Sequence, residues 1–332
     1  KKVQEERIMR TGKFLSDTVS ILALGSADFG GRIDAGRAYE IMDAYTEIGG
    51  NFIDTAHVYG DFQTPKNGES ERVIGRWMHA RHNRGHIFLS TKGAHPALGK
   101  MNEGRLSRED VRADIQESLS CLGCNFVDVF FLHRDDESRS VGDIMETMQG
   151  LIDDGFTRHI GASNWKTNRI QAANAYALAH GLTPFSANQP QLSLAKQMIV
   201  EDPTLVPADA EMIQMHRETG MIMTPFSSQG KGFFTKLDAL GEAGLSDKAR
   251  RRFLYPENLE VYSKLRLLRE KTGLSIGALA LAWLTSQDFP VFPIVGASSP
   301  EQALAFREAG GAVLSKADRD GLRTLESLPH RR

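Results

Sequence analysis

Four ionisable side chains stand where together they could deliver a proton to the oxygen of a carbonyl group. Asp54 and Tyr59 lie in GGNFIDTAHVYG, Lys92 lies in LSTKGA and His133 lies in FFLHRDD. A free tyrosine has a pKa of about 10, so it holds its proton too tightly to be an ideal acid at neutral pH. A neighbouring ammonium favours the phenolate and lowers such a pKa. The combination is suited to protonating an oxygen that becomes an alkoxide.

Each of the four residues is assigned its own task. Tyr59 is the general acid, and Lys92 supplies the positive charge beside it. Asp54 holds the ammonium and balances the cost of burying it. His133 donates a hydrogen bond to the same oxygen and orients the carbonyl. Each residue alone has an ordinary structural explanation, such as a turn cap, a packed ring or a solvated amine, so the interpretation depends on the combination.

Eight short apolar or β-branched runs are predicted to be strands. They span residues 20–25, 51–54, 86–91, 126–133, 159–163, 184–188, 221–227 and 291–296. The segments between them place apolar residues three or four apart, as amphipathic helices do. The chain therefore alternates strand and helix throughout.

This alternation fits either a closed barrel or an open doubly wound sheet. An open dinucleotide-binding sheet should carry G-x-G-x-x-G after an early strand, and no predicted strand is followed by that pattern. Candidate polar residues instead follow several different strands, as they do at the mouth of a barrel. We predict a (β/α)8 barrel, formed by one domain over residues 1–332 with its core at about 18–327.

Local signals also predict helix starts and one long loop. Three serines are each followed three residues later by an aspartate, which is typical of a helix N-terminus: Ser107 with Asp110, Ser140 with Asp143 and Ser315 with Asp318. The longest irregular stretch is expected at 228–255, between the seventh and eighth strands, where it could form a lid over a site.

Composition narrows the classes of partner. The 332 residues are 41% hydrophobic and 25% charged, as in an ordinary globular protein. A net charge of −2 does not indicate the basic surface that binds nucleic acid or an anionic membrane. A small-molecule substrate is therefore favoured. No apolar run is long enough to cross a bilayer, and the opening KKVQEERIMR lacks the apolar core of a signal peptide. We expect a cytoplasmic protein.

The two cysteines, Cys121 and Cys124, lie in SCLGCN. A redox C-x-x-C pair is one interpretation, but its usual position at the start of a helix is missing, because here the pair falls at a helix end. A tetrahedral zinc site would need two further ligands at matching spacing, and none is found. Ordinary structural cysteines are favoured.

Five motifs in order along the chain carry a family resemblance. GGNFIDTAHVYG, LSTKGA, FFLHRDD, IGASNW and PIVGASSPEQ resemble the successive motifs of the aldo-keto reductases, from about residue 18 to 310. The resemblance implies a (β/α)8 barrel that moves hydride between a nicotinamide cofactor and a carbonyl group, without a metal. It places the family's catalytic tetrad on Asp54, Tyr59, Lys92 and His133.

The resemblance also implies three groups of cofactor-binding residues. Those that hold the nicotinamide carboxamide are Ser163, Asn164 and Gln189. Those that wrap the pyrophosphate are Phe226, Ser227, Ser228, Gln229, Gly230 and Lys231. Those at the adenosine end are Gly296, Ser298 and Gln302. Ser298 also has a structural interpretation as the cap of the helix that begins at PEQ, and it could serve both roles.

Two positions depart from the family pattern. Leu192 stands where an aromatic ring usually stacks on the nicotinamide. Leucine has no ring, so the stabilisation from stacking, about 0.5 to 1.5 kcal/mol, is lost. VGASSPEQALAF offers no Lys or Arg to a 2′-phosphate, and Phe306 replaces a usual polar residue. Arg251 or Arg252 could compensate, since a guanidinium pairs well with phosphate. NADP(H) is favoured by the resemblance, while NAD(H) stays open.

The expected substrate mouth combines polar and aromatic side chains. Its residues are Asp28, Phe29, His57, Phe62, Arg134 and Trp165. Such a lining suits a hydroxylated carbonyl, for example a keto sugar, better than a long lipid. The leading function is therefore an oxidoreductase that acts on an aldehyde, ketone or keto sugar.

Two other function classes stay open from the sequence. A cofactor-binding regulatory or sensor subunit is favoured by Leu192 and by the weak 2′-phosphate site, and is opposed by the intact tetrad. A metal-dependent barrel hydrolase would use Asp54, His57 and His133 as ligands, with Lys92 as a carboxylated bridge. That alternative lacks a further histidine pair at a later strand end.

Overall fold

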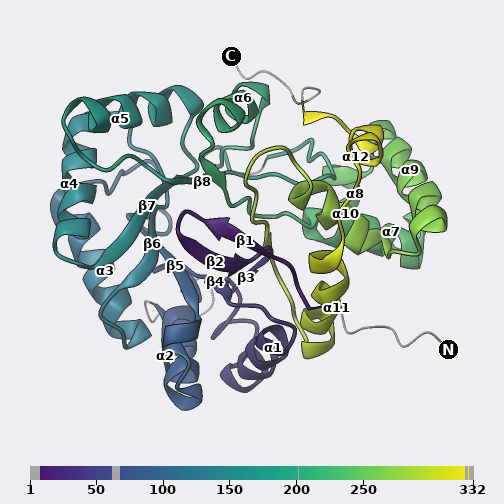
Figure 1. Cartoon of the computed structure of the whole chain (residues 1–332), viewed down its shortest axis with the longest axis horizontal. Coiled ribbons are helices and arrows are strands. Elements are labelled where there is room, and N and C mark those ends of the chain that lie inside the picture. Colours follow the sequence, from purple (N-terminus) through teal and green to yellow (C-terminus); the bar gives the residue numbers. More distant parts are fainter. Residues whose placement is uncertain (1–7, 62–67, 201, 326–327, 329–332) are drawn as a thin grey trace.

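The computed structural model describes residues 8–61, 68–200, 202–325 and 328. Eight parallel strands lie in the order β10-β3-β4-β5-β6-β7-β8-β9, with helices outside them (Figure 1). A parallel bridge between Met223 and Val291 joins the two ends of this order. The predicted (β/α)8 barrel is confirmed.

Each of the eight predicted runs overlaps a barrel strand. The strands are β3 (Ala23–Gly25), β4 (Phe52–Asp54), β5 (Phe88–Gly93), β6 (Val127–Leu132), β7 (Thr157–Ser163), β8 (Ala187–Gln189), β9 (Ile222–Met223) and β10 (Ile294–Val295). β4, β5 and β6 are buried at every position, because the barrel interior covers one face and the helices cover the other. Because both faces of these strands are buried, the predicted runs are mainly apolar or β-branched over consecutive positions.

The sequence did not predict the hairpin that precedes the barrel. β1 (Thr11–Phe14) pairs antiparallel with β2 (Asp17–Ser20), and the predicted strand at 20–25 merges the last residue of β2 with β3. Phe14 is fully buried and its ring lies 5.9 Å from that of Phe52 and 4.9 Å from that of Phe88. The hairpin therefore covers the end of the barrel where these strands begin, opposite the mouth.

Three of the helices outside the barrel strands have the serine caps that the sequence predicts. Outside residues 228–255, the α-helices of the described residues are α1 (Ala35–Glu47), α2 (Glu69–Arg81), α3 (Arg108–Leu122), α4 (Val141–Asp153), α5 (Thr167–Ala179), α6 (Ala210–Thr219), α9 (Pro256–Thr272), α10 (Ile276–Thr285), α11 (Pro300–Gly311) and α12 (Lys316–Leu322). Ser107, Ser140 and Ser315 each accept a backbone N–H three residues on, at 3.0 to 3.1 Å. None of the helices in the described part of the chain is both long and apolar enough to cross a bilayer.

The prediction that Ser298 caps a helix is wrong, because the cap is the next residue along the chain. α11 begins with Pro300 at its first position, so the preceding Ser299 is the cap and its Oγ accepts the N–H of Gln302 at 3.3 Å. The Ser298 hydroxyl instead donates to Oε1 of Gln302 at 3.1 Å.

The prediction of a long irregular loop at 228–255 is also wrong. This segment folds into α7 (Phe233–Leu240) and α8 (Asp247–Phe253), with short 3-10 turns at Gly230–Gly232 and Glu242–Gly244. Ser246 caps α8, and Phe233 stacks on Phe253 with ring centroids 5.5 Å apart. Glycines on either side of α7 made this segment look irregular in the sequence. Tertiary packing nevertheless stabilises two short helices there.

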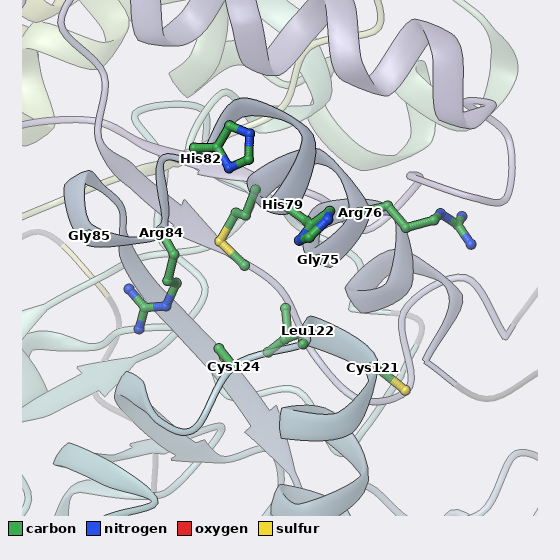
Figure 2. Close-up of a pocket in the computed structure, with 11 residues that line it drawn as sticks. Gly75, Arg76, His79, His82, Arg84, Gly85, Cys121, Leu122 and Cys124 are labelled. Atoms are coloured by element: carbon green, nitrogen blue, oxygen red, sulfur yellow. The ribbon is translucent and has the colours of Figure 1, made fainter.

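Helices α2 and α3 touch at Gly75, which gives a test of the packing. A methyl group built there would lie 2.6 Å from the carbonyl oxygen of Cys121, and backbone cannot move aside easily (Figure 2). We expect Gly75→Ala to lower the free energy of unfolding by about 1 to 2 kcal/mol in urea denaturation, since overpacking outweighs the gain in helix propensity. Gly85→Ala is the matched control, because nothing lies within 4 Å of its new methyl group. Equal stability of the two variants would contradict this packing.

Candidate active site

Three adjacent strands bring the predicted tetrad to one end of the barrel. Asp54 is the last residue of β4, Lys92 lies near the end of β5, and His133 follows β6 directly. Tyr59 sits on the turn after β4, where its N–H donates to the carbonyl of Ala56 at 3.0 Å. Because parallel strands end at the same edge, residues 79 positions apart in the chain, from 54 to 133, meet in space.

Lys92 and Asp54 form a buried ion pair with 1% exposure each. The Lys92 ammonium lies 2.7 Å from Oδ2 of Asp54 and donates to the carbonyl of Thr55 at 2.6 Å. Oδ1 of Asp54 accepts from Ser90 Oγ at 2.7 Å and from Gln189 Nε2 at 3.1 Å. Burial opposes the charge on Lys92, but Asp54 and Tyr59 together outweigh it, and the pKa of Lys92 is raised above its ordinary value. The amine is therefore a cation.

The same ammonium reaches Tyr59. Nζ of Lys92 donates to the Tyr59 hydroxyl at 3.3 Å and lies 4.6 Å from the centre of its ring. Because Lys92 donates in this contact, the hydroxyl proton of Tyr59 is not used in it and can be directed elsewhere.

His133 completes the group as a neutral imidazole. Its ring meets that of Tyr59 edge-on at 5.8 Å and that of His95 at 4.8 Å. Burial, and after it the positive charge of Arg134, lowers the pKa of His133 well below its ordinary value. Its buried Nδ1 has no hydrogen-bond partner among the residues described. A bare lone pair costs less there than an unpaired N–H, so the proton belongs on Nε2.

The three residues predicted around the nicotinamide lie beside the tetrad. Ser163 Oγ donates to the carbonyl of Gln189 at 2.9 Å, and Gln189 contacts Asp54 as described above. Asn164 has a φ of 61° and its Nδ2 donates to the carbonyl of His133 at 3.2 Å. All three side chains are buried at adjoining strand ends, so the fold brings them together.

The segment predicted to wrap a pyrophosphate has an unusual backbone. Ser227, Gly230, Lys231 and Gly232 all have φ between 53° and 74°, and the N–H groups of Gly230 and Gly232 donate within the segment at 2.8 and 2.9 Å. Phe226 anchors the segment through its N–H to the carbonyl of Pro190 at 3.0 Å. The Lys231 ammonium is the group of this loop whose chemistry fits a phosphate.

Positive charge gathers around Lys231. Desolvation, followed by the charge of Arg252 and those of Lys248 and Arg32, lowers the pKa of Lys231 below its ordinary value. The negative charge of Asp28 opposes these cations. Of the two arginines proposed to compensate for the missing phosphate ligand, Arg252 is the one whose charge acts on Lys231.

The residues expected at the adenosine end are linked to this loop. The N–H of Gly296 donates to Oε1 of Gln229 at 2.9 Å, and Ser228 Oγ donates to the carbonyl of Ile294. Ser298 and Gln302 bond to one another as described for α11. Leu192, at the usual stacking position, is 4% exposed and its N–H donates to the carbonyl of Phe226 at 3.3 Å.

The residues expected at the substrate mouth lie in different environments. Phe29 and Trp165 are 1% and 0% exposed, and neither presents a surface that a substrate could reach in this arrangement. The Asp28 carboxylate faces Arg32 at 3.8 Å and its side chain is 47% exposed. Arg134 is buried beside the tetrad, and Phe62 lies outside the described residues.

His57 is bound to a carboxylate rather than free for a metal. Its Nε2 lies 3.0 Å from Oε2 of Glu117. Burial opposes its charge, but Asp114 and Glu117 raise the pKa of His57 above its ordinary value. With Asp54 held by Lys92, the ligand set of a hydrolase is not assembled, and the described residues contain no group of three His, Cys, Asp or Glu side chains suited to a metal.

Both cysteines are free thiols at the C-terminal end of α3 (Figure 2). Burial raises the pKa of Cys121 to about 11 and also raises that of Cys124. Cys121 Sγ accepts a hydrogen bond from Arg72 at 2.8 Å. A thiol with a raised pKa is a poor nucleophile and metal ligand at neutral pH, as an ordinary structural cysteine is.

His95 is the residue that the sequence analysis missed. It lies three positions after Lys92 in KGAHP and packs on His133, so it belongs to the same mouth. The available signal was its position just beyond the end of a barrel strand, where site residues gather.

Comparison with known proteins gives one consistent picture. A model described as the aldo/keto reductase family matches residues 21–326. The chain is 30% identical over 317 residues to an aryl-alcohol dehydrogenase of Pestalotiopsis microspora, covering 90% of this chain and 77% of that protein. It is 30% identical over 315 residues to norsolorinic acid reductase B of Dothistroma septosporum, covering 90% and 76%. A putative aryl-alcohol dehydrogenase of Saccharomyces cerevisiae is 29% identical over 299 residues, covering 84% and 75%.

Proposed function

The chain belongs to the aldo/keto reductase family of NAD(P)H-dependent oxidoreductases, and from that premise we propose that Tyr59 exchanges the proton when an aromatic carbonyl and its alcohol are interconverted. The observation that carries the proposal is the chain of contacts from Asp54 to Lys92 to Tyr59, with the ammonium 3.3 Å from the hydroxyl. A cation held by a buried carboxylate beside a phenol is arranged to stabilise a phenolate.

When bound, a nicotinamide cofactor supplies or takes the hydride. Tyr59 gives its hydroxyl proton to the oxygen of the carbonyl, and the remaining phenolate is stabilised by the Lys92 ammonium. Asp54 keeps that ammonium in place and balances its charge. The Nε2–H of His133 donates to the same oxygen, and in the neutral ring that its burial favours this requires the tautomer with the proton on Nε2. In alcohol oxidation the same groups act in reverse, with Tyr59 taking the proton.

The contacts support a cofactor site along one side of the mouth. Ser163, Asn164 and Gln189 would hold the carboxamide, and the residues from Phe226 to Lys231 would hold the pyrophosphate. Gly296, Ser298 and Gln302 would lie at the adenosine end. The pyrophosphate is common to NAD(H) and NADP(H), so we assign Arg252, whose charge acts on Lys231, to the additional phosphate of NADP(H).

The substrate class is inferred from the relatives. Two of those described above are named aryl-alcohol dehydrogenases and one is named a norsolorinic acid reductase. We therefore place an aromatic aldehyde or ketone ahead of the keto sugar that the sequence alone favoured.

The test is to titrate the purified protein with NADPH and NADH and then screen aromatic aldehydes and keto sugars for loss of reduced-nicotinamide absorbance. We expect NADPH to bind about tenfold more tightly, because charge-assisted hydrogen bonds are worth about 1.5 to 3 kcal/mol. Raising the salt concentration should narrow that difference. Turnover of aromatic aldehydes supports the proposal. Tight cofactor binding with no turnover of any carbonyl would favour the regulatory subunit instead.

A further inference from the structure

His95 stands against the His133 ring and is held rigidly. The two ring centroids are 4.8 Å apart at an angle of 68°. Nδ1 of His95 lies 2.7 Å from the carbonyl oxygen of Pro96, and the His95 carbonyl accepts from Arg105 at 3.1 Å. Both the ring and the backbone of His95 are therefore fixed before any substrate arrives.

These contacts determine which nitrogen of His95 is an acceptor. Nδ1 must donate, because a carbonyl oxygen can only accept. Burial, and after it the charge of Arg134, lowers the pKa of His95 to about 4, so the ring is neutral near pH 7. Nε2 then carries a lone pair. No described residue bonds to it, and it is not among the fully enclosed unpartnered atoms, so this atom keeps some exposed surface although His95 as a whole is buried.

Apart from the fully buried Nδ1 of His133, the other polar groups around this point are donors or are already engaged. Lys92, Tyr59 and His133 present N–H or O–H groups, which suit a carbonyl oxygen. Arg134 donates to the His133 carbonyl at 2.8 Å and to Thr204 Oγ1 at 2.9 Å. His95 is thus an acceptor at the edge of a group of donors. A substrate that offered only a carbonyl oxygen would leave Nε2 unused.

We propose that Nε2 of His95 accepts a hydrogen bond from a hydroxyl group of the substrate, so that the enzyme selects carbonyl compounds that carry a hydroxyl near the carbonyl. This inference rests on the proposed function, because Tyr59 and His133 must receive the carbonyl oxygen for the hydroxyl to face His95. His95 is then a specificity-determining residue and takes no part in the proton transfer.

Two substitutions separate the acceptor from the rest of the side chain. In His95→Asn the shorter amide can still donate to the Pro96 carbonyl in place of Nδ1, but it falls short of the Nε2 position. In His95→Gln the amide oxygen reaches about as far as Nε2 does. The two variants remove the same ring, and they differ in whether an acceptor remains at the outer position.

The substrates are 2-hydroxybenzaldehyde and 3-hydroxybenzaldehyde, each paired with its methoxy analogue, which has similar electronic character but no donor. We expect wild-type kcat/KM at pH 6.5 to be about tenfold higher for the better hydroxy compound than for its methoxy partner, the value of one hydrogen bond. The preference should disappear in His95→Asn and persist in His95→Gln. NADPH binding should be unchanged in both variants, which shows that each has folded.

Equal kcat/KM within both pairs for the wild-type enzyme would overturn the role of His95, as would a preference that survives in His95→Asn. Failure of the proposed function looks different, because then the wild-type protein reduces none of the four aldehydes. The methoxy compounds separate these cases, since they need Tyr59 but not His95.

Discussion

Tyr59→Phe is expected to lower kcat for carbonyl reduction by about 10²- to 10⁴-fold while cofactor binding stays unchanged. The substitution removes one hydroxyl and leaves a ring of the same shape. That hydroxyl accepts from Lys92 at 3.3 Å, and its own proton is the one assigned to the carbonyl oxygen. Single-turnover reduction of an aromatic aldehyde, beside a titration with NADPH, measures both quantities.

Tyr176→Phe is the matched control for this prediction. The Tyr176 hydroxyl donates to Glu146 at 2.9 Å on the outer surface of the barrel, away from the mouth. Its removal should leave kcat as in the wild-type enzyme. If Tyr59→Phe also kept full activity, another group would have to supply the proton, and the assignment of Tyr59 as the acid would be lost.

Lys92→Met is expected to abolish turnover and also to destabilise the fold. Asp54 would be left at 1% exposure without a cation, and among the described residues its carboxylate would keep Ser90 and Gln189 as hydrogen-bond donors. Removing one member of a buried ion pair costs about 3 to 5 kcal/mol, because the other charge stays buried without compensation. The free energy of unfolding from urea denaturation and the rate of aldehyde reduction should therefore both fall.

The double variant Asp54→Asn with Lys92→Met separates these two effects. It removes both charges together, so most of the lost stability should return, while the rate stays low because no cation lies beside Tyr59. Lys316→Met is the control for loss of a lysine, since Lys316 pairs with Asp320 at 3.1 Å with 83% of its side chain exposed. A double variant that regained the wild-type rate would show that Lys92 acts only by holding the fold together.

The sequence predicted the features that short-range patterns encode. Every barrel strand lies at least partly within its predicted run, because double burial makes a strand apolar over several consecutive residues. Ser107, Ser140 and Ser315 cap helices as expected, since a cap depends only on the next three residues. The order of the motifs was enough to predict a barrel with an oxidoreductase site at its mouth.

Features that depend on packing between distant segments were not predicted. Phe29 and Trp165 were expected at the substrate mouth and are fully covered, because a sequence does not state which way a side chain points. The β1–β2 hairpin and the helices within 228–255 are short, and short elements take their stability from tertiary contacts rather than from their own pattern. His95 was missed because its partner His133 lies 38 positions away, from 95 to 133.

The sequence by itself determined which residue types were available for the chemistry and which strand each one follows. Only the tertiary structure decided the distances and charge states. Closing the barrel sets Gln189 against Asp54, 135 residues away in the chain, and excludes water from the pair of Asp54 and Lys92. Burial keeps His133 neutral, whereas the nearby Asp54 and Tyr59 keep Lys92 charged against the cost of burial. Desolvation and Coulomb interaction depend on separation in space, which local sequence does not specify.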